Sequence, residues 1–85
     1  MTETNIVLYQ TEWCPYCADV RAQLDRLGLS YKIVDVPDEH SRRTELMEIF
    51  GTTGVPSLID GDVKIGNDEE MIVDYLEHKY GDDAC

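Results

Sequence analysis

The sequence is poor in basic residues. Its 85 residues include 7 Lys and Arg against 18 Asp and Glu, which leaves a formal net charge of −11. A nucleic-acid partner would need basic side chains for its phosphates, and so would an anionic membrane surface. We therefore expect no nucleic acid and no membrane among the partners.

Long apolar runs and targeting features are also missing. No stretch approaches the roughly 18 consecutive apolar residues of a membrane-spanning helix. The first residues, MTETNIVLYQ, have neither the basic start nor the apolar centre of a signal peptide. The sequence contains no repeat, linker or low-complexity segment. We therefore expect a single domain over residues 1–85, a monomer, located in the cytoplasm.

Cysteine is scarce. The three cysteines, Cys14, Cys17 and Cys85, are too few for a disulfide framework. In a cytoplasmic protein a close pair indicates redox chemistry or a metal instead. A zinc site needs two further ligands, and the candidates Cys85, His40 and His78 form no second close pair. Two buried thiols without a function are the third interpretation.

The apolar pattern predicts alternating strands and helices. Strands are expected at residues 5–10, 31–36, 57–59 and 62–65, and helices from the cysteine pair to Gly28, from Asp38 or Ser41 to Gly51, and from Asn67 or Asp68 to Gly81. An Asp60-Gly61 turn should join the last two strands in a hairpin. The order β-α-β-α-β-β-α predicts an α/β fold, with a four-stranded mixed sheet flanked by three helices on both faces.

The first helix should begin at the cysteine pair, with Cys14 at its N-terminus. Free N–H groups and the positive end of the helix dipole favour a thiolate there, and the thiolate is the nucleophilic form. Pro15 suits the first helical turn, where its missing N–H costs nothing. Cys17 returns to the same side one turn later and can attack a mixed disulfide at Cys14. We expect Cys14, at the exposed helix end, to react first.

Three motifs in this order resemble the glutaredoxins: WCPYC after a strand, GVPSLID in the middle and IGNDEE near the end. The resemblance runs from Ile6 to about Tyr80. It implies the thioredoxin-like fold and thiol–disulfide oxidoreductase activity without a bound cofactor. It also implies that Cys14 is the nucleophile and Cys17 the resolving thiol, with disulfide-containing proteins and mixed disulfides as substrates.

The same resemblance implies a site for a low-molecular-weight thiol. Val55 and Pro56 match the family's Val-Pro, whose bond is cis and whose backbone pairs with a cysteinyl peptide beside the nucleophile. A proline that begins a strand is the plain alternative. Gly66, Asn67 and Asp68 stand where the family holds the γ-glutamyl end of glutathione. Ordinary helix capping by Asn67 or Asp68 explains these residues without a ligand.

The sequence departs from the family in three places. Gln10, Thr11 and Glu12 replace the basic residue that meets the glycine carboxylate of glutathione. Arg42 or Arg43 could substitute for that residue, or could lie on a solvated helix face; Arg43 is our candidate. Gly54 replaces a usual Thr. Trp13, more typical of thioredoxins, should be half exposed, and we expect Trp13, Pro15 and Tyr16 to contact the substrate.

The missing cation would suit a thiol that lacks the glycine. We therefore expect glutathione or γ-glutamylcysteine as the electron donor, and the latter would fit a halophilic archaeon, in line with the acidic composition. Trp13 and Gly54 favour an alternative, a thioredoxin-like reductase of protein disulfides that is recharged by a thioredoxin-reductase-like flavoprotein. A third interpretation, an iron–sulfur cluster held between two copies, is disfavoured by Pro15 and by the second cysteine.

Two further features lie near the end of the sequence. The stretch DGDVKIGNDEEMIVDYLEHKYG also resembles the N-terminal domain of glutathione transferases. Those enzymes carry a large helical second domain, and this sequence ends at Cys85, so we expect no transferase activity. Cys85 has no role in the family and is expected to be a bystander; an intermolecular disulfide or glutathionylation is the alternative.

The acidic composition makes a testable prediction about salt. If the acidic surface is an adaptation to high salt, the free energy of unfolding should rise between low and molar KCl. The Debye length then falls from about 10 Å at 0.1 M to about 3 Å at 1 M, which screens the repulsion between carboxylates. Urea unfolding at both KCl concentrations measures the difference. An unchanged free energy of unfolding would contradict adaptation to high salt and would favour an ordinary acidic protein.

Overall fold

The computed structural model describes residues 4–81. Its elements are β1 (Ile6–Gln10), α1 (Pro15–Arg26), β2 (Lys32–Asp35), a short 3₁₀ turn (His40–Arg42), α2 (Thr44–Phe50), β3 (Ser57–Asp60), β4 (Val63–Ile65) and α3 (Glu69–Tyr80). Apart from the 3₁₀ turn, this is the predicted order. Cys85 lies outside the described residues, so its role stays a prediction.

Strand β1 lies inside the sheet, whose order is β2-β1-β3-β4. It pairs in parallel with β2 and antiparallel with β3, with Tyr9 opposite Ser57. The carboxyl end of β1 and the amino end of β3 therefore lie at the same edge of the sheet. The segments after Gln10 and before Ser57, which carry Cys14 and Pro56, must approach each other at this edge.

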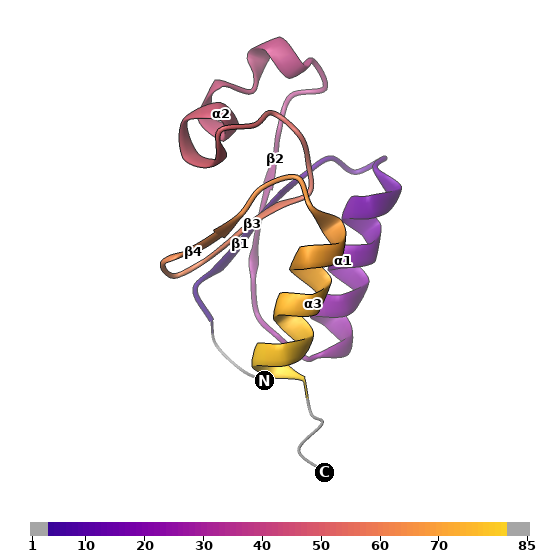
Figure 1. The fold of residues 1–85 in the computed structure, drawn as a ribbon. Helices are drawn as coiled ribbons and strands as arrows, with labels where there is room; N and C mark the ends of the chain where they lie inside the picture. Colours follow the sequence, from indigo (N-terminus) through magenta and orange to yellow (C-terminus); the bar gives the residue numbers. More distant parts are fainter. Residues whose placement is uncertain (1–3, 82–85) are drawn as a thin grey trace.

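Helices cover both faces of the sheet, as predicted. Helices α1 and α3 lie side by side on one face, and α2 lies on the other (Figure 1). Successive side chains of β1 point to opposite faces: Leu8 belongs to the core under α1 and α3, whereas the Tyr9 ring meets Phe50 of α2 edge-on at 5.5 Å. The core under α1 and α3 consists of Ile6, Leu8, Val20, Leu24, Leu29, Leu58, Ile65, Ile72 and Leu76.

The predicted start of the second helix was wrong. Neither Asp38 nor Ser41 caps it: the chain makes the 3₁₀ turn first, and Arg43 precedes α2 without a side-chain cap. Tertiary contacts explain the difference, because the Asp38 carboxylate accepts a hydrogen bond from the Trp13 indole at 3.0 Å. A short polar side chain that can cap a helix can equally bind another segment.

The hairpin turn lies one residue later than predicted. Asp60 pairs with Val63 inside the ladder, so Gly61 and Asp62 form the turn, and Gly61 has a φ of 62°. The side chain of Asp60 is buried, and its Oδ2 accepts hydrogen bonds from Tyr80 at 2.6 Å, Tyr75 at 2.8 Å and Lys79 at 3.3 Å. These contacts with α3 keep Asp60 in the strand.

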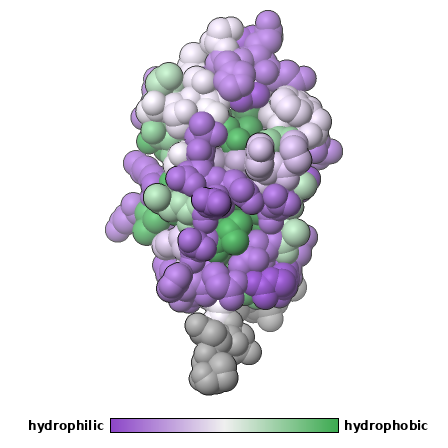
Figure 2. All heavy atoms as spheres, turned by 45° about the vertical axis from the view of Figure 1, so that its right-hand side comes forward, coloured by the Kyte–Doolittle hydropathy of each residue, from purple (hydrophilic) through white to green (hydrophobic). Residues whose placement is uncertain are grey.

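Hydrophilic residues cover most of the face drawn in Figure 2. In the view toward α1 and α3, hydrophobic areas are small and separated by hydrophilic residues (Figure 2). No helix among the described residues is long and apolar enough to cross a membrane.

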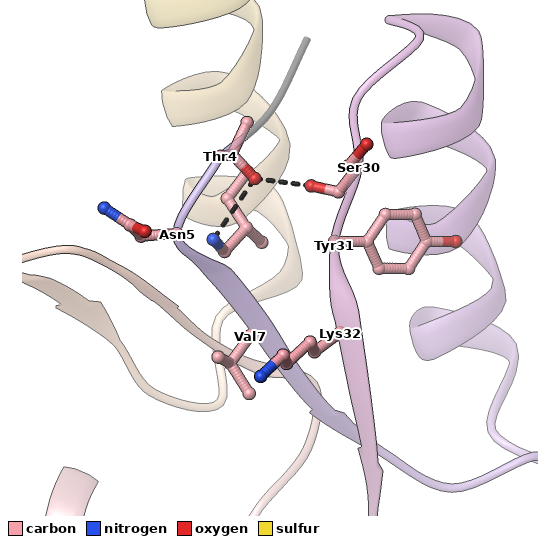
Figure 3. A pocket seen from close by; sticks show the side chains of 7 residues that line it. Thr4, Asn5, Val7, Ser30, Tyr31 and Lys32 are labelled. Atoms are coloured by element: carbon pink, nitrogen blue, oxygen red, sulfur yellow. Dashed lines mark hydrogen bonds between the residues drawn. The ribbon is translucent and has the colours of Figure 1, made fainter. Parts of the chain in front are cut away.

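A hollow of about 450 Å³ lies at the amino ends of β1 and β2, away from the cysteine pair. There the Thr4 hydroxyl donates to the Ser30 carbonyl and accepts from the backbone N–H of Ile6, while the Tyr31 ring points toward α1 (Figure 3). No cysteine lines this hollow. Its place at the opposite end of the sheet separates it from the redox chemistry.

The contacts of Asp60 predict a pH-dependent contribution to stability. Burial raises the pKa of this carboxyl, but hydrogen bonds from Tyr80, Tyr75 and Lys79 outweigh it, and the net pKa is lowered. The ionised Asp60 therefore stabilises the fold above its unfolded pKa of about 3.9, and this contribution is lost as the pH falls through the folded value. Asp60→Asn should cost about 1–3 kcal/mol at pH 7.

Urea unfolding of the wild type and Asp60→Asn at pH 7 and at pH 3 measures this contribution. The difference in unfolding free energy should shrink at the lower pH. Asp62→Asn removes the same charge from the exposed turn and is the matched control. A difference for Asp60→Asn that is the same at both pH values would contradict the assignment.

Candidate redox site

Cys14 is the N-cap residue of α1. Its backbone is extended, with φ −80° and ψ 120°, and its Sγ accepts the backbone N–H of Cys17 at 3.4 Å. Pro15 follows in the first helical turn, where no N–H is needed. The sulfur thus lies against the free N–H groups of the helix end, which favour negative charge.

Cys14 is not exposed as predicted: it is only 7% exposed, so its place at the helix end, and not its exposure, distinguishes it from Cys17. Cys17 lies one turn inside the helix and is fully buried. Burial is the main reason why the pKa of its thiol is raised, to about 12, and the neighbouring Cys14 adds to the shift. A backbone hydrogen bond from Thr11 and the charge of Arg21 act in the opposite direction. At neutral pH Cys17 is therefore a thiol, and no disulfide joins it to Cys14 in this structure.

A groove of about 320 Å³ adjoins the cysteine motif. The sequence predicted five of its seven lining residues; the complete set is Tyr16, Val55, Pro56, Asn67, Asp68, Glu69 and Glu70. The peptide bond between Val55 and Pro56 is cis, as the resemblance implied. The fold thus brings the cysteine motif, the Val-Pro segment and the start of α3 together.

Ser57 ties two of these segments together, and the sequence analysis missed it. Its fully buried hydroxyl donates to the Gly54 carbonyl and accepts the backbone N–H of Asn67, each at 3.0 Å. One side chain therefore holds the Val-Pro segment at a set distance from the start of α3. A serine directly after Val-Pro was the only signal for this contact in the sequence.

Arg43 does not have the role predicted for it. The side chain is buried, and its guanidinium donates to the carbonyls of Pro37 at 2.6 Å, Thr53 at 2.9 Å and Asp38 at 3.2 Å. A guanidinium held in this way is not free to meet the carboxylate of a thiol in the groove. It links the segment after β2 to the segment before Pro56.

The other predicted contacts differ in exposure. Trp13 is 66% exposed and Tyr16 is 59% exposed, so both rings can meet a substrate. Gly66 allows close packing, because a Cβ there would press against Phe50 and Thr52. Asp68 caps α3, accepting the Met71 N–H with Oδ1 at 3.0 Å. Its second oxygen is not used by that cap, so capping and ligand binding are compatible.

Within residues 4–81, no three His, Cys, Asp or Glu side chains are grouped as metal ligands. The zinc interpretation had named His40 and His78. His40 instead contacts the Thr53 hydroxyl, and His78 contacts the carbonyl of Asp74 in its own helix.

Comparison with known proteins agrees with this geometry. The family model described as glutaredoxin matches residues 6–65. A glutaredoxin from Pseudomonas aeruginosa is 30% identical over 66 residues, which cover 78% of this chain and 79% of that protein. The chain belongs to the glutaredoxin family. It is therefore a thiol–disulfide oxidoreductase.

Solved structures show the same fold. A glutaredoxin from Archaeoglobus fulgidus has a TM-score of 0.67 at 22% identity and covers 86% of each chain. A glutathione transferase homolog from Drosophila mojavensis, solved with bound glutathione, has a TM-score of 0.85 at 30% identity. The match covers 94% of this chain but only 37% of the homolog.

Two residues near the groove are coupled in space. Gly54 stands where the resemblance implied a Thr, and Asn67 directly precedes Asp68, the N-cap of α3. A Cβ on residue 54 would overlap the carboxamide of Asn67. Asn67 itself has a φ of 52°, a conformation that Gly and Asn tolerate best. The Asn67 side chain thus occupies space that a Thr at position 54 would need.

This overlap predicts that the two positions compensate each other. Gly54→Thr alone should lower the unfolding free energy by about 1–3 kcal/mol because it displaces the Asn67 carboxamide. The same change in an Asn67→Gly background should cost less, with a coupling of at least about 0.5 kcal/mol. Urea unfolding of the four proteins in this double-mutant cycle measures the coupling. Additive effects would show that the two positions are independent.

Proposed function

We propose that Cys14 attacks a protein disulfide or a mixed disulfide, that Cys17 resolves the intermediate, and that a γ-glutamyl thiol reduces the oxidised protein. The contrast between the two sulfurs carries this proposal. Cys14 Sγ accepts a helix N–H at the end of α1, whereas Cys17 is fully buried, with its pKa raised to about 12 by that burial. Only the first environment favours the nucleophilic thiolate.

The groove supports binding of a thiol beside Cys14. An extended peptide can pair with the backbone of Val55, and the N-terminus of α3 can accept a carboxylate. The second oxygen of Asp68 can accept an ammonium. The transferase homolog solved with bound glutathione supports a γ-glutamyl thiol as the ligand.

The distribution of basic residues favours a thiol with fewer carboxylates than glutathione. No Lys or Arg lines the groove, whereas Asp68, Glu69 and Glu70 do. The seven basic residues lie elsewhere: Arg26, Arg42 and Lys79 form ion pairs, Arg43 binds backbone carbonyls, Arg21 binds Gln10, Lys32 lines the distant hollow, and Lys64 lies in β4. The glycine carboxylate of glutathione would meet no counter-charge, so γ-glutamylcysteine fits better.

Exposure of Trp13 favours a second candidate function. An indole that is 66% exposed next to Cys14 is a contact surface for a protein partner. The chain would then act as a reductase of protein disulfides that is recharged by a flavoprotein. Turnover of insulin with a thioredoxin reductase, without any low-molecular-weight thiol, is the measurement that supports this candidate.

The proposed thiol chemistry is tested with one peptide in two mixed disulfides, one with glutathione and one with γ-glutamylcysteine. At low salt we expect the γ-glutamylcysteine form to have a kcat/KM about three- to tenfold higher, equivalent to about 0.7–1.4 kcal/mol from the unmatched carboxylate. Equal values would remove the basis for preferring γ-glutamylcysteine.

Cysteine variants separate the thiol preference from the mechanism. Cys14→Ser should lose turnover of both mixed disulfides. Cys17→Ser should lose the reduction of protein disulfides but keep some turnover of mixed disulfides, because that reaction can proceed through Cys14 alone. A Cys14→Ser protein with full activity would overturn the proposed mechanism.

A further inference from the structure

A chain of polar side chains runs behind the cysteine pair and is unused in the mechanism above. Gln10, the last residue of β1, is 1% exposed, and its Nε2 donates to Asp35 Oδ1 at 2.7 Å. Its Oε1 accepts a hydrogen bond from the Arg21 guanidinium. Both ends of one buried amide are thus satisfied, and the arginine is tied to the carboxyl end of β1.

Helix geometry places Arg21 next to the resolving thiol. Arg21 follows Cys17 by four residues on α1, so the two side chains share one face of the helix. Long helical side chains lean toward the N-terminus and cover the preceding turn, which here contains Cys17. The hydrogen bond to Gln10 keeps the guanidinium at this end of the sheet.

Arg21 has no direct carboxylate partner among residues 4–81. The ion pairs of this region use Arg26 with Glu77, Arg42 with Glu39, and Lys79 with Asp60. The amide of Gln10 lies between Arg21 and the nearby Asp35, so a neutral group holds the guanidinium in place. No direct ion pair therefore neutralises the positive charge of Arg21, and this charge can act on neighbouring groups.

We propose that Arg21, held by Gln10, is a positioning residue of the resolving step, where its charge stabilises the thiolate of Cys17. This inference rests on the proposed dithiol function. Burial has the largest effect on the pKa of Cys17, followed by the backbone of Thr11, by Cys14 and by Arg21, and Arg21 is the only cation among these groups. Asp35 binds the far end of the Gln10 amide and is not among the groups that shift the pKa of Cys17.

The step that Arg21 assists is a balanced exchange. The Cys17 thiol loses its proton, and its sulfur attacks Cys14 Sγ in the mixed disulfide. A bond forms between Cys14 and Cys17, the bond from Cys14 to the substrate sulfur breaks, and the substrate leaves as a thiolate that takes up a proton. The two cysteines are oxidised to a disulfide, and the substrate sulfur is reduced.

The size of the effect follows from the charge. Removing a nearby opposite charge raises the pKa of a thiol by about one unit, at the low end of the usual range for such pairs. The thiolate fraction then falls about tenfold, but a more basic thiolate is about threefold more nucleophilic, with a Brønsted coefficient of about 0.4–0.5. We therefore expect Arg21→Gln to slow resolution about threefold.

A chromophoric aryl disulfide separates the two steps in a stopped-flow experiment. The first phase is the attack of Cys14, and its rate depends on reagent concentration. The second phase is the attack of Cys17, which releases a second aryl thiolate at a rate independent of concentration. Arg21→Gln should slow the second phase about threefold, with the first phase unchanged.

Matched variants keep this test decisive. Arg26→Gln removes the same charge from the exposed side of the same helix and should leave both phases unchanged. Arg21→Lys keeps the charge and should give a second phase faster than that of Arg21→Gln. Equal second phases in Arg21→Gln and Arg26→Gln, an equal loss in both phases, or no advantage of Arg21→Lys would each overturn the proposal.

Failure of this proposal is distinguishable from failure of the proposed function. Cys14→Ser should lose the first phase, and Cys17→Ser should lose only the second. If these two results hold and Arg21→Gln has no effect on the second phase, the dithiol mechanism stands and Arg21 has no part in it.

Discussion

The antiparallel pairing of β1 with β3 is the constraint on which the redox site depends. Because Tyr9 lies opposite Ser57, the end of one strand and the start of the other meet at one edge of the sheet. Cys14 follows β1 and Pro56 precedes β3, so the same pairing carries both segments to that edge. The core under α1 and α3 holds this pairing in place, since each buried Leu or Ile contributes about 1.5–3 kcal/mol.

Side-chain contacts to the backbone then set the shape of the site. Arg43 links the segment after β2 to the segment before Pro56, and Ser57 joins the Val-Pro segment to the start of α3. These buried donors have their acceptors within the fold, and a buried polar group left unpaired would be costly. The same hydrogen bonds therefore position the segments around the groove and stabilise the fold, so the groove is largely preformed.

Positive charge is scarce both in the groove and around the cysteine pair. The groove carries carboxylates and no base, and within residues 4–81 Arg21 is the only cation that lowers the pKa of Cys17. In a chain with a net charge of −11, placing one of seven basic residues behind the resolving thiol concentrates positive charge where the exchange needs it. Gln10 makes this possible because its neutral amide holds Arg21 without cancelling the charge.

Local periodicity and short motifs were enough to predict the order of the elements, Cys14 at a helix end, the family and most of the groove. Packing of the strands and helices was needed to show that Arg43 is buried, that Asp38 binds Trp13, that Asp60 stays in β3, and that Gly54 accommodates Asn67. Except for Arg43, whose acceptors lie within ten residues of it, each of these depends on a contact between segments far apart in the chain. The residue type is readable from the sequence, but its partner is known only once the strands and helices have packed.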